Sequence, residues 1–491
     1  MTSRKCSRCG KFDMKYHFDT KHCIDCERKR VSTTFRLSKY LIPGHFTTEQ
    51  QEVCIDVFKK LKGWKDKKEG GLIQISGRGG CGKTEILSFL TGVTHSVVCG
   101  PTHKSVQVLR DRLKSTDYAN KVSIQTCHQF FNASPAYTDA GELQFKVSLP
   151  SRVECNVLLI DEVSMIPDDI YEVYIKMIEK FKLYIITFGD EAQLTPVRPN
   201  KPLAPSLFYK NHSIDFKLKT NFRNEYPEYN SILNGLRIHQ IENRKDRFPV
   251  LELLRGLEKV SRKEAIDMFC DDDGDNRVIA HRTNDKNNTV SKLNTMVRQK
   301  LYGVNANNRF NSGERVEFTD HHTGQLLVKE PPYHESRIRY YANDQVIIRY
   351  VNETSRSYEG KDIRVYELKL ENGDTLYSVY TEDLLLFNRL VEKRKKYVLS
   401  QVNRVLIPLN DTEKYLLWQD FYDESSTMNA PIDYSYAISC HKSQGSSYDK
   451  VYVNIEDFIW FFKTNQKSKV KQFLQLLYVA LSRSRSTAIL F

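Results

Sequence analysis

The stretch LIQISGRGGCGKT, residues 72–84, decides the fold of this 491-residue chain. Its first five residues are typical of a buried strand, and the next eight match the pattern G-x-x-x-x-G-K-[ST] before an apolar helical pattern begins. In this strand–loop–helix order the glycines let backbone N–H groups close around phosphates, and the helix N-terminus adds its dipole. The stretch therefore predicts a phosphate-binding loop in a parallel α/β domain.

Individual positions of this loop have separate expected roles. Lys83 is expected to neutralise the β- and γ-phosphates of ATP, and Thr84 to ligate Mg²⁺. Cys81 is interpreted as a small filler of the loop rather than a reactive thiol. The predicted ATP-contacting residues of the loop are Gly77, Arg78, Gly79, Gly80, Cys81, Gly82, Lys83 and Thr84.

A second apolar run, NVLLIDE, ends in the acidic pair Asp161 and Glu162. An ATPase places its magnesium ligand and its water-activating base at the carboxyl end of a buried parallel strand. Asp161 is therefore expected to hold Mg²⁺ through water, and Glu162 to polarise the attacking water. A solvated strand end would be the simpler interpretation if the phosphate-binding loop were absent.

Composition and charge restrict the partners of the chain. Its formal net charge of +13 raises the local concentration of polyanions, so nucleic acid is the leading candidate, although a merely soluble basic protein could have the same charge. The most apolar clusters are too short to cross a bilayer, and no membrane partner is expected. Eleven cysteines without a visible export signal predict reduced thiols in a cytoplasmic protein.

The N-terminal segment CSRCGKFDMKYHFDTKHCIDC contains two Cys-x-x-Cys pairs separated by thirteen residues. Two such pairs can supply four thiolates to tetrahedral Zn²⁺, and a module this small could hardly fold without its metal. Four unligated cysteines are the alternative interpretation. The predicted zinc ligands are Cys6, Cys9, Cys23 and Cys26.

Nine segments, in order, resemble superfamily 1 helicases, closest to the RecD/Dda-like branch. They are FTTEQ (46–50), GRGGCGKT (77–84), CGPTHKSVQVLR (99–110), IQTCHQFF (124–131), LIDEVSM (159–165), GDEAQLTPV (189–197), LKTNFRN (218–224), YAISCHKSQGSSYDKVYV (436–453) and YVALSRSR (478–485). The resemblance covers about residues 35–491. It implies an α/β fold of two RecA-like P-loop domains, with ATP in the cleft between them.

The resemblance also implies roles for residues around the ATP. Gln50 would read the adenine, although Thr48 and Gln51 also fit a helix capping box at this position. Gln193 would sense the γ-phosphate and couple it to the DNA side. The expected cationic fingers, which stabilise charge on the transferred phosphoryl group, are Arg223 and Arg483, whereas Arg485 is interpreted as a surface or DNA contact.

Strand contacts are implied at three of the matching segments. Short polar and basic side chains that bond phosphate suit a motor, because they carry no sequence information. Each histidine among them could instead be a packing residue. The predicted DNA-binding residues are Thr102, His103, Lys104, Thr126, His128, His441, Lys442 and Ser443.

Two insertions interrupt the predicted motor. The turn within residues 133–150 predicts a β-hairpin, and relatives use such a hairpin as a pin that splits the duplex. Tyr137 or Phe145 would stack on the last base pair, unless the aromatics simply pack inward. Short alternating strands predict a small β-barrel at 311–387, which resembles the SH3-like domain of Dda-type helicases. The expected domains are a zinc module at 1–32, a first RecA-like domain at 33–215 containing the hairpin, and a second at 216–310 with 388–491.

These features predict an ATP- and Mg²⁺-dependent DNA helicase. The resemblance further implies a phage-type enzyme that moves 5′-to-3′ on single-stranded and forked DNA in replication or recombination. It would work in the cytoplasm of a bacterium or a phage-infected cell. The zinc module would hold the substrate or a replication or recombination protein. The alternatives are an RNA helicase and a non-enzymatic single-strand-binding or loading factor.

Overall fold

The computed structural model describes four two-residue strands before residue 42 and most of residues 42–491. The ranges that it does not describe after residue 41 are 115–121, 132–133, 138–142, 197–203, 223–225, 242–251, 284–288, 321, 324–337, 404–408 and 465–469. The predicted zinc ligands lie outside the described residues, except for the backbone of Cys23. In this N-terminal segment β1 (Arg4–Lys5) pairs with β2 (Phe12–Asp13), and β3 (Tyr16–His17) pairs with β4 (His22–Cys23).

The chain divides into two compact units, of which the first comprises residues 1–132, 148–191 and 195–222. Its core is a six-stranded sheet of order β12-β5-β11-β10-β6-β7, in which every neighbouring pair is parallel. The strands are β5 (Gly71–Gly77), β6 (Ser96–Gly100), β7 (Ser123–Thr126), β10 (Val157–Ile160), β11 (Tyr184–Gly189) and β12 (Phe216–Leu218). The predicted boundary at 215 assigned β12 to the second domain, but its pairing with β5 includes it in the first sheet.

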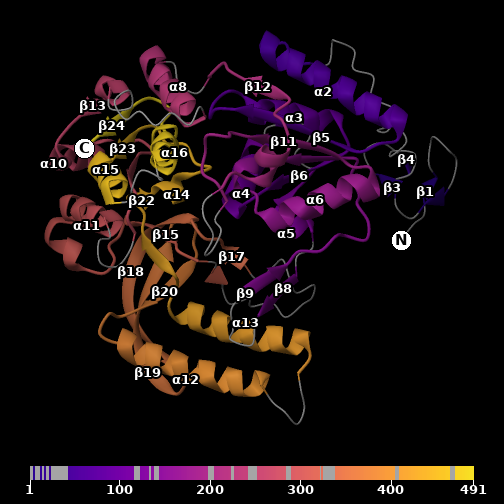
Figure 1. The fold of residues 1–491 in the computed structure, drawn as a ribbon. Helices are drawn as coiled ribbons and strands as arrows, with labels where there is room; N and C mark the ends of the chain where they lie inside the picture. The colour runs from indigo at the N-terminus through magenta and orange to yellow at the C-terminus, as the bar shows by residue number, and fades with distance from the viewer. Residues whose placement is uncertain are drawn as a thin grey trace. The chain divides into compact units, whose positions relative to one another are not determined.

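Helices cover both faces of this sheet (Figure 1). Val98 of β6 lies in one core cluster with apolar side chains of α2, α3 and α4. The next residue, Cys99, lies against Tyr174 of α6 on the opposite face, where the Tyr174 ring packs 4.7 Å from Phe131 and 6.2 Å from Phe208. The helices are α2 (Thr48–Lys67), α3 (Lys83–Val93), α4 (His103–Leu113), α5 (Cys127–Phe130), α6 (Asp168–Phe181) and α7 (Leu207–Asn211), with the 3₁₀ turn η2 (Val163–Met165).

The second unit comprises residues 133–147, 192–194 and 223–491, and it contains another parallel sheet, of order β13-β24-β23-β14-β22. Ile279 of β14 packs with α8 and α16, whereas its neighbours Val278 and Ala280 pack with α10 and α11, so helices cover both faces. The strands are β13 (Glu258–Lys259), β14 (Arg277–Ala280), β22 (Ala437–Ser439), β23 (Val451–Val453) and β24 (Ala488–Leu490). The helical elements are α8 (Pro227–Ile241), η3 (Leu254–Gly256), α10 (Arg262–Asp271), α11 (Thr289–Tyr302), α14 (Cys440–Ser443), α15 (Ile455–Thr464) and α16 (Val470–Leu481).

An antiparallel sheet of order β20-β19-β18-β15-β21 is inserted between α11 and β22. Its strands are β15 (Arg315–Phe318), β18 (Gln345–Tyr358), β19 (Lys361–Leu370), β20 (Thr375–Val379) and β21 (Ile432–Tyr434). The short η4 (Gly303–Asn307) precedes it, and β16 (His322–Thr323) pairs with β17 (Ile338–Tyr340) beside it. Because β21 completes this sheet, the insertion extends well past the predicted end at residue 387.

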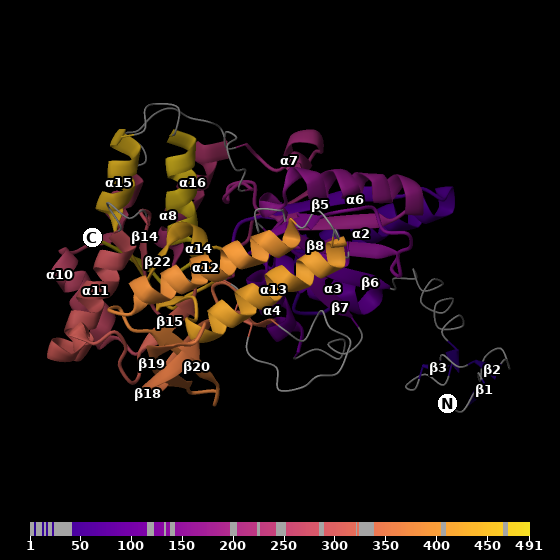
Figure 2. The same ribbon diagram turned by 90° about the horizontal axis from the view of Figure 1, so that it is seen from below.

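Residues 388–430, which were predicted to belong to the second RecA-like domain, instead form most of a helical pair. Helices α12 (Leu384–Val402) and α13 (Asp411–Met428) run side by side (Figure 2). Val398 and Trp418 pack in the seam between them, while Phe387 and Met428 pack on the inserted sheet. The apolar faces of both helices are therefore used within the insertion.

The predicted hairpin at 133–150 consists of β8 (Ser134–Tyr137) and β9 (Leu143–Lys146), paired antiparallel. It was predicted as part of the first domain, but residues 133–147 group with the second unit, where β8 contacts α13. The side chains of Tyr137 and Phe145 lie outside what the structure describes. Among the described residues, no helix combines the length and apolar character that crossing a bilayer would require.

Candidate nucleotide site and strand-contact residues

The phosphate-binding loop joins the end of β5 at Gly77 to the start of α3 at Lys83. Gly80 and Gly82 both have positive φ values, of 86° and 78°, which side chains rarely adopt. A Cβ atom at Gly82 would also lie 2.1 Å from Nε2 of Gln50. Only glycine fits this position, and the loop backbone is thereby free to approach phosphates closely.

Lys83 is nearly buried in the first turn of α3. Its Nζ donates hydrogen bonds to the carbonyl oxygens of Gly77, at 2.6 Å, and Arg78, at 2.9 Å. The ammonium group thus lies across the loop with neutral oxygens as its described partners. A polyphosphate would offer it charged oxygens, which make stronger hydrogen bonds.

Asp161 and Glu162 follow the last residue of β10. Burial and the Glu162 carboxylate raise the pKa of Asp161 to about 6, while the Lys83 cation opposes the shift. Glu162 has a φ of 49°, which costs a non-glycine residue roughly 1–2 kcal/mol and is the kind of strain found at functional sites. Its Oε2 is buried with no hydrogen-bond partner in the described part of the chain.

This acidic pair fits a divalent cation. A buried carboxylate oxygen without a partner and a neighbouring carboxylate with a raised pKa are both stabilised by positive charge. Asp161 and Thr84, in the first turn of α3, would hold Mg²⁺, which would neutralise charge on the transferred phosphoryl group.

Gln50 caps its helix and also lies beside the phosphate-binding loop. The capping box of α2 is formed by Thr47 and Gln50, one residue before the predicted Thr48–Gln51 pair: Gln50 N donates to Thr47 Oγ1, and Thr47 N donates to Gln50 Oε1 at 3.0 Å. The remaining amide nitrogen of Gln50 lies over Gly82. The residue therefore caps its helix and faces the loop with a donor.

Phe222 is a loop neighbour that the sequence reasoning did not single out, although it lies within the matching segment LKTNFRN. Its backbone N–H donates to the carbonyl of Gly80 at 2.8 Å, and its ring lies near Gly82 while remaining half exposed. An exposed ring beside a nucleotide loop is suited to stacking on a base. The next residue, the predicted finger Arg223, lies outside the described residues.

Gln193 is buried in the second unit, where its neighbours Ala192 and Leu194 join the core. Its Oε1 accepts a hydrogen bond from Gln444 Nε2 at 3.2 Å, and its carbonyl accepts from Gln475 Nε2 at 3.3 Å. Gln444 belongs to the segment HKSQG that was expected to contact the strand, but it was not itself predicted as a site residue. The expected phosphate sensor is therefore bonded directly to that segment.

Arg483 is 2% exposed, and all of its described partners are neutral. Its guanidinium donates to the carbonyls of Val479 and Ser446, at 3.1 and 3.3 Å, and to the hydroxyl of Ser482 at 2.9 Å. Arg485 differs, because it pairs with Asp449 on the surface at 2.8 Å. Of the two arginines, Arg483 is the one with no acidic partner among the described residues.

Each of the three predicted strand-contact segments lies at the start of a helix that follows a parallel strand. The hydroxyl of Thr102 caps α4, that of Thr126 caps α5, and that of Ser439 caps α14. The predicted His103 and Lys104 lie in the first turn of α4, where the helix dipole favours phosphate. Burial lowers the pKa of His128 in α5, although Asp169 opposes that shift.

The structure gives α14 a different arrangement from the predicted one. His441 is exposed, and its ring lies 6.2 Å from that of His281 at the end of β14. Lys442 Nζ instead contacts Oε1 of Glu317 in β15 at 2.5 Å. Ser443 is fully buried, and its hydroxyl donates to the carbonyl of Cys440.

A second feature near α14 was not anticipated. Asp457 of α15, 1% exposed, accepts hydrogen bonds from the backbone N–H groups of His281 and Arg282, at 2.7 and 2.9 Å. The Arg282 guanidinium lies 4.3 Å from the ring centre of Trp460, which is 40% exposed. This buried carboxylate holds a basic and aromatic loop beside His441; no pattern in the sequence points to it.

Comparison with known proteins assigns two domain types to this chain. The AAA domain family matches residues 64–199, and the UvrD-like helicase C-terminal domain family matches residues 434–491. An uncharacterized protein of Acanthamoeba polyphaga mimivirus is 23% identical over 474 residues, covering 84% of this chain and 94% of that protein. The chain thus has the two parts of an ATP-driven helicase, an ATP-binding domain and a helicase C-terminal domain.

Solved structures with a similar chain course include three of Pif1 helicases. One, of two coordinating Pif1 helicases at forked dsDNA, has a TM-score of 0.47 at 18% identity and covers 91% of this chain and 92% of its own. The Bacteroides Pif1 complex with ADP-AlF3 and ssDNA has a TM-score of 0.42 at 17% identity and covers 90% of this chain and 92% of its own. The Candida albicans Pif1 structure has a TM-score of 0.43 at 14% identity and covers 91% of this chain and 94% of its own.

Proposed function

We propose that this chain is an ATP-dependent DNA helicase that moves along a single strand, 5′-to-3′, and separates the duplex ahead of it. The contact that supports this most directly is the 3.2 Å hydrogen bond between Gln193 and Gln444. It joins the residue expected to sense the γ-phosphate to the segment expected to touch the strand. Through this bond a change at the γ-phosphate would be passed to the strand contacts.

On the ATP side, Lys83 binds the β- and γ-phosphates and exchanges its loop carbonyls for phosphate oxygens. Glu162 orients the attacking water, and its strained backbone holds the carboxylate beside Asp161. Arg483 contributes positive charge to the transferred phosphoryl group. Bound Mg²⁺ would neutralise the charge on the phosphates.

On the strand side, the proposed contacts are sequence-independent. The starts of α4, α5 and α14 follow the carboxyl ends of parallel strands and combine helix N-termini with histidine or lysine side chains. Such groups bind phosphate oxygens without reading bases. Alternating affinity of these contacts during the ATP cycle would convert hydrolysis into steps along the strand.

Strand separation is assigned to the hairpin β8–β9, with Tyr137 or Phe145 against the last base pair. The contact of β8 with α13 supports this role, because it attaches the hairpin to the insertion, proposed to be SH3-like, and a wedge needs a rigid support. The four N-terminal cysteines are proposed to bind Zn²⁺ and to hold DNA or a replication or recombination protein. Their paired spacing supports this proposal.

Unwinding of DNA duplexes with a 5′ or a 3′ single-stranded tail tests the proposal, with Lys83→Ala as the inactive control. Duplexes of RNA with the same tails test the choice of nucleic acid. ATP-dependent unwinding from the 5′ tail of DNA is the expected result. Unwinding from the 3′ tail alone would overturn the polarity, a preference for RNA would overturn the substrate, and no unwinding of any duplex would overturn the function.

A further inference from the structure

A β-bulge in β18 turns one tyrosine out of the inserted sheet. Ile348 pairs with Leu370 of β19, but Tyr350 pairs with Lys369, so two residues of β18 advance where β19 advances one. In a regular strand, side chains two positions apart share a face, and Tyr350 would lie on the buried side with Ile348. The bulge places Tyr350 in solvent instead, with 53% of its surface exposed. Bulges that re-aim a side chain are common beside functional sites.

Polar and basic groups surround the exposed ring. Its cross-strand partner Lys369 projects from the same face of the ribbon, because directly opposed residues in an antiparallel pair share a face. The next pair on that face, Asn352 and Glu367, is joined by a 3.2 Å hydrogen bond. The Arg349 guanidinium lies 5.3 Å from the centre of the Tyr350 ring. The ring therefore has two cations beside it, Arg349 and Lys369, while Glu367 is bonded to Asn352.

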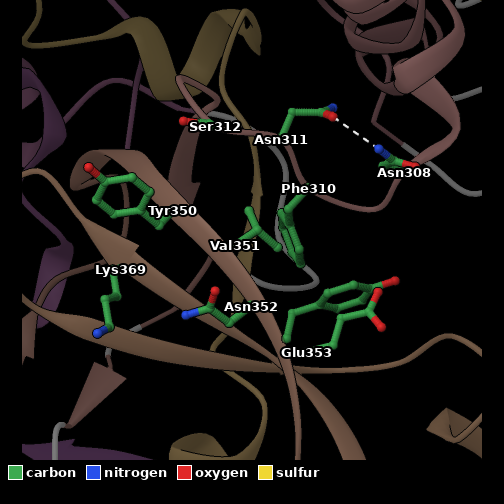
Figure 3. Close-up of a pocket in the computed structure, with 10 residues that line it drawn as sticks. Asn308, Phe310, Asn311, Ser312, Tyr350, Val351, Asn352, Glu353 and Lys369 are labelled. Carbon is green, nitrogen blue, oxygen red and sulfur yellow. Dashed lines mark hydrogen bonds between the residues drawn. The ribbon is translucent and has the colours of Figure 1, made fainter.

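Tyr350 and Lys369 form one flank of a hollow of about 640 Å³ (Figure 3). Its aromatic part is rigid, because Tyr366 packs edge-on against Phe310 at 5.6 Å and stacks on Tyr380 at 4.0 Å. The loop that leads into β15 supplies amide groups, including that of Asn311. A hollow of this size is large enough for a nucleotide-sized ligand.

The chemistry of the hollow fits an unpaired base with its phosphates. An exposed aromatic ring offers stacking to any base, and nearby cations offer contacts to the flanking phosphates. Side-chain amides can donate to and accept from base edges. The lining also contains one carboxylate, that of Glu353, opposite in charge to Lys369. A purely apolar ligand would leave these polar groups without partners.

We propose that this hollow binds a base of single-stranded nucleic acid, with Tyr350 stacking on the base and Lys369 meeting an adjoining phosphate. The site gives the inserted sheet a grip on the strand separate from the contacts at the helix starts of the two parallel sheets. The proposal rests on the proposed function, since it assumes that the chain binds a single strand.

A double-mutant cycle between the tyrosine and the base tests the site. Fluorescence anisotropy would measure the affinity of the full chain for an oligothymidylate and for an abasic strand of equal length. Loss of one stacked base corresponds to about 5- to 150-fold weaker binding. We expect this loss for Tyr350→Ala on the oligothymidylate, no additional loss on the abasic strand, and retained affinity for Tyr350→Phe, which keeps the ring.

Tyr397→Ala is the matched control, because Tyr397 lies on α12, outside the hollow, and is 52% exposed, close to the 53% of Tyr350. It should bind both strands like the unaltered chain. Equal affinities of Tyr350→Ala and the unaltered chain for the oligothymidylate would overturn the site, as would an equal loss on both strands. The site would also be overturned if Tyr350→Ala lost binding to a protein partner while keeping its affinity for both strands. Failure of the unaltered chain to bind strands would instead overturn the proposed function.

Discussion

Lys83 and Lys442 occupy comparable positions in the two parallel-sheet regions, each at or near the start of a helix that follows a strand, yet their partners differ. Lys83 is bonded to two neutral carbonyls of its own loop, at 2.6 and 2.9 Å. Lys442 is paired with the carboxylate of Glu317, 2.5 Å away and 125 residues distant in the chain. The first arrangement leaves the ammonium ready for an anionic ligand. The second uses it to tie a motor helix to the inserted sheet.

Lys83→Ala tests the first half of this comparison and should have the largest effect. Removing the cation that offsets phosphate charge is expected to lower the ATPase kcat about 100- to 1,000-fold, the usual effect of losing one group that stabilises transition-state charge. The melting temperature should fall only modestly, because the carbonyl of Arg78 keeps a hydrogen bond from the N–H of Cys81. Steady-state ATPase assays and thermal unfolding would measure both. A normal kcat would contradict the assignment of this loop.

Glu317→Gln tests the second half, and it should reduce stability more than catalysis. Breaking a buried pair costs about 3–5 kcal/mol, but Lys442 is 34% exposed, so solvent reduces the expected loss to about 1–3 kcal/mol in the free energy of unfolding. Urea denaturation would measure it. Asp272→Asn is the matched control, since it breaks the more exposed Lys450–Asp272 pair, which has a similar length of 2.6 Å, and should cost less. Equal losses in both variants would show that the burial of Glu317 is unimportant.

The two lysines also show what the sequence could predict. The phosphate-binding loop and the acidic pair could be placed because strand, loop and helix are consecutive, so local patterns determine their geometry. The direction of the Lys442 side chain could not be predicted, because its partner Glu317 lies on an inserted strand that is distant in the sequence. The burial of Ser443 could not be predicted for a related reason: a helical turn determines which of three neighbouring residues faces inward, and the motif gives only their order.

For the fold as well, features set by consecutive residues could be predicted, and features set by distant partners could not. The phosphate-binding loop predicted a parallel α/β domain, and the resemblance to superfamily 1 helicases implied two such domains; the structure contains two parallel sheets. The start of α2 was displaced by one residue, because Thr47 with Gln50 and Thr48 with Gln51 fit the capping box equally well. The helical pair α12–α13 was missed because its apolar residues, such as Trp418 and Val398, indicate burial without indicating which surface buries them.

Gln193 and Gln444 offer a smaller but more specific test of how the ATP side communicates with the strand side. Each is nearly buried, and removing one leaves the other with an unsatisfied amide, which typically costs about 1–3 kcal/mol. Strand-stimulated ATPase rates of Gln193→Ala, Gln444→Ala and the double variant would form a cycle. We expect the double variant to lose no more stimulation than either single variant. Fully additive losses would mean that the 3.2 Å hydrogen bond does not couple the two residues.

Arg485→Ala should have the smallest effect. It compares an arginine that is paired with a carboxylate, Arg485, with one whose described partners are neutral, Arg483. Arg485 pairs with Asp449 at 2.8 Å, and both side chains are about half exposed, so the pair contributes at most about 1 kcal/mol to stability. Because this arginine already has an acidic partner, its loss should leave the ATPase kcat within about twofold, whereas Arg483→Ala should lower it about 100-fold or more. Urea denaturation and ATPase assays of the two variants would separate these outcomes. If Arg485→Ala were the more damaging to kcat, the finger would have to be reassigned from the buried arginine to its exposed neighbour.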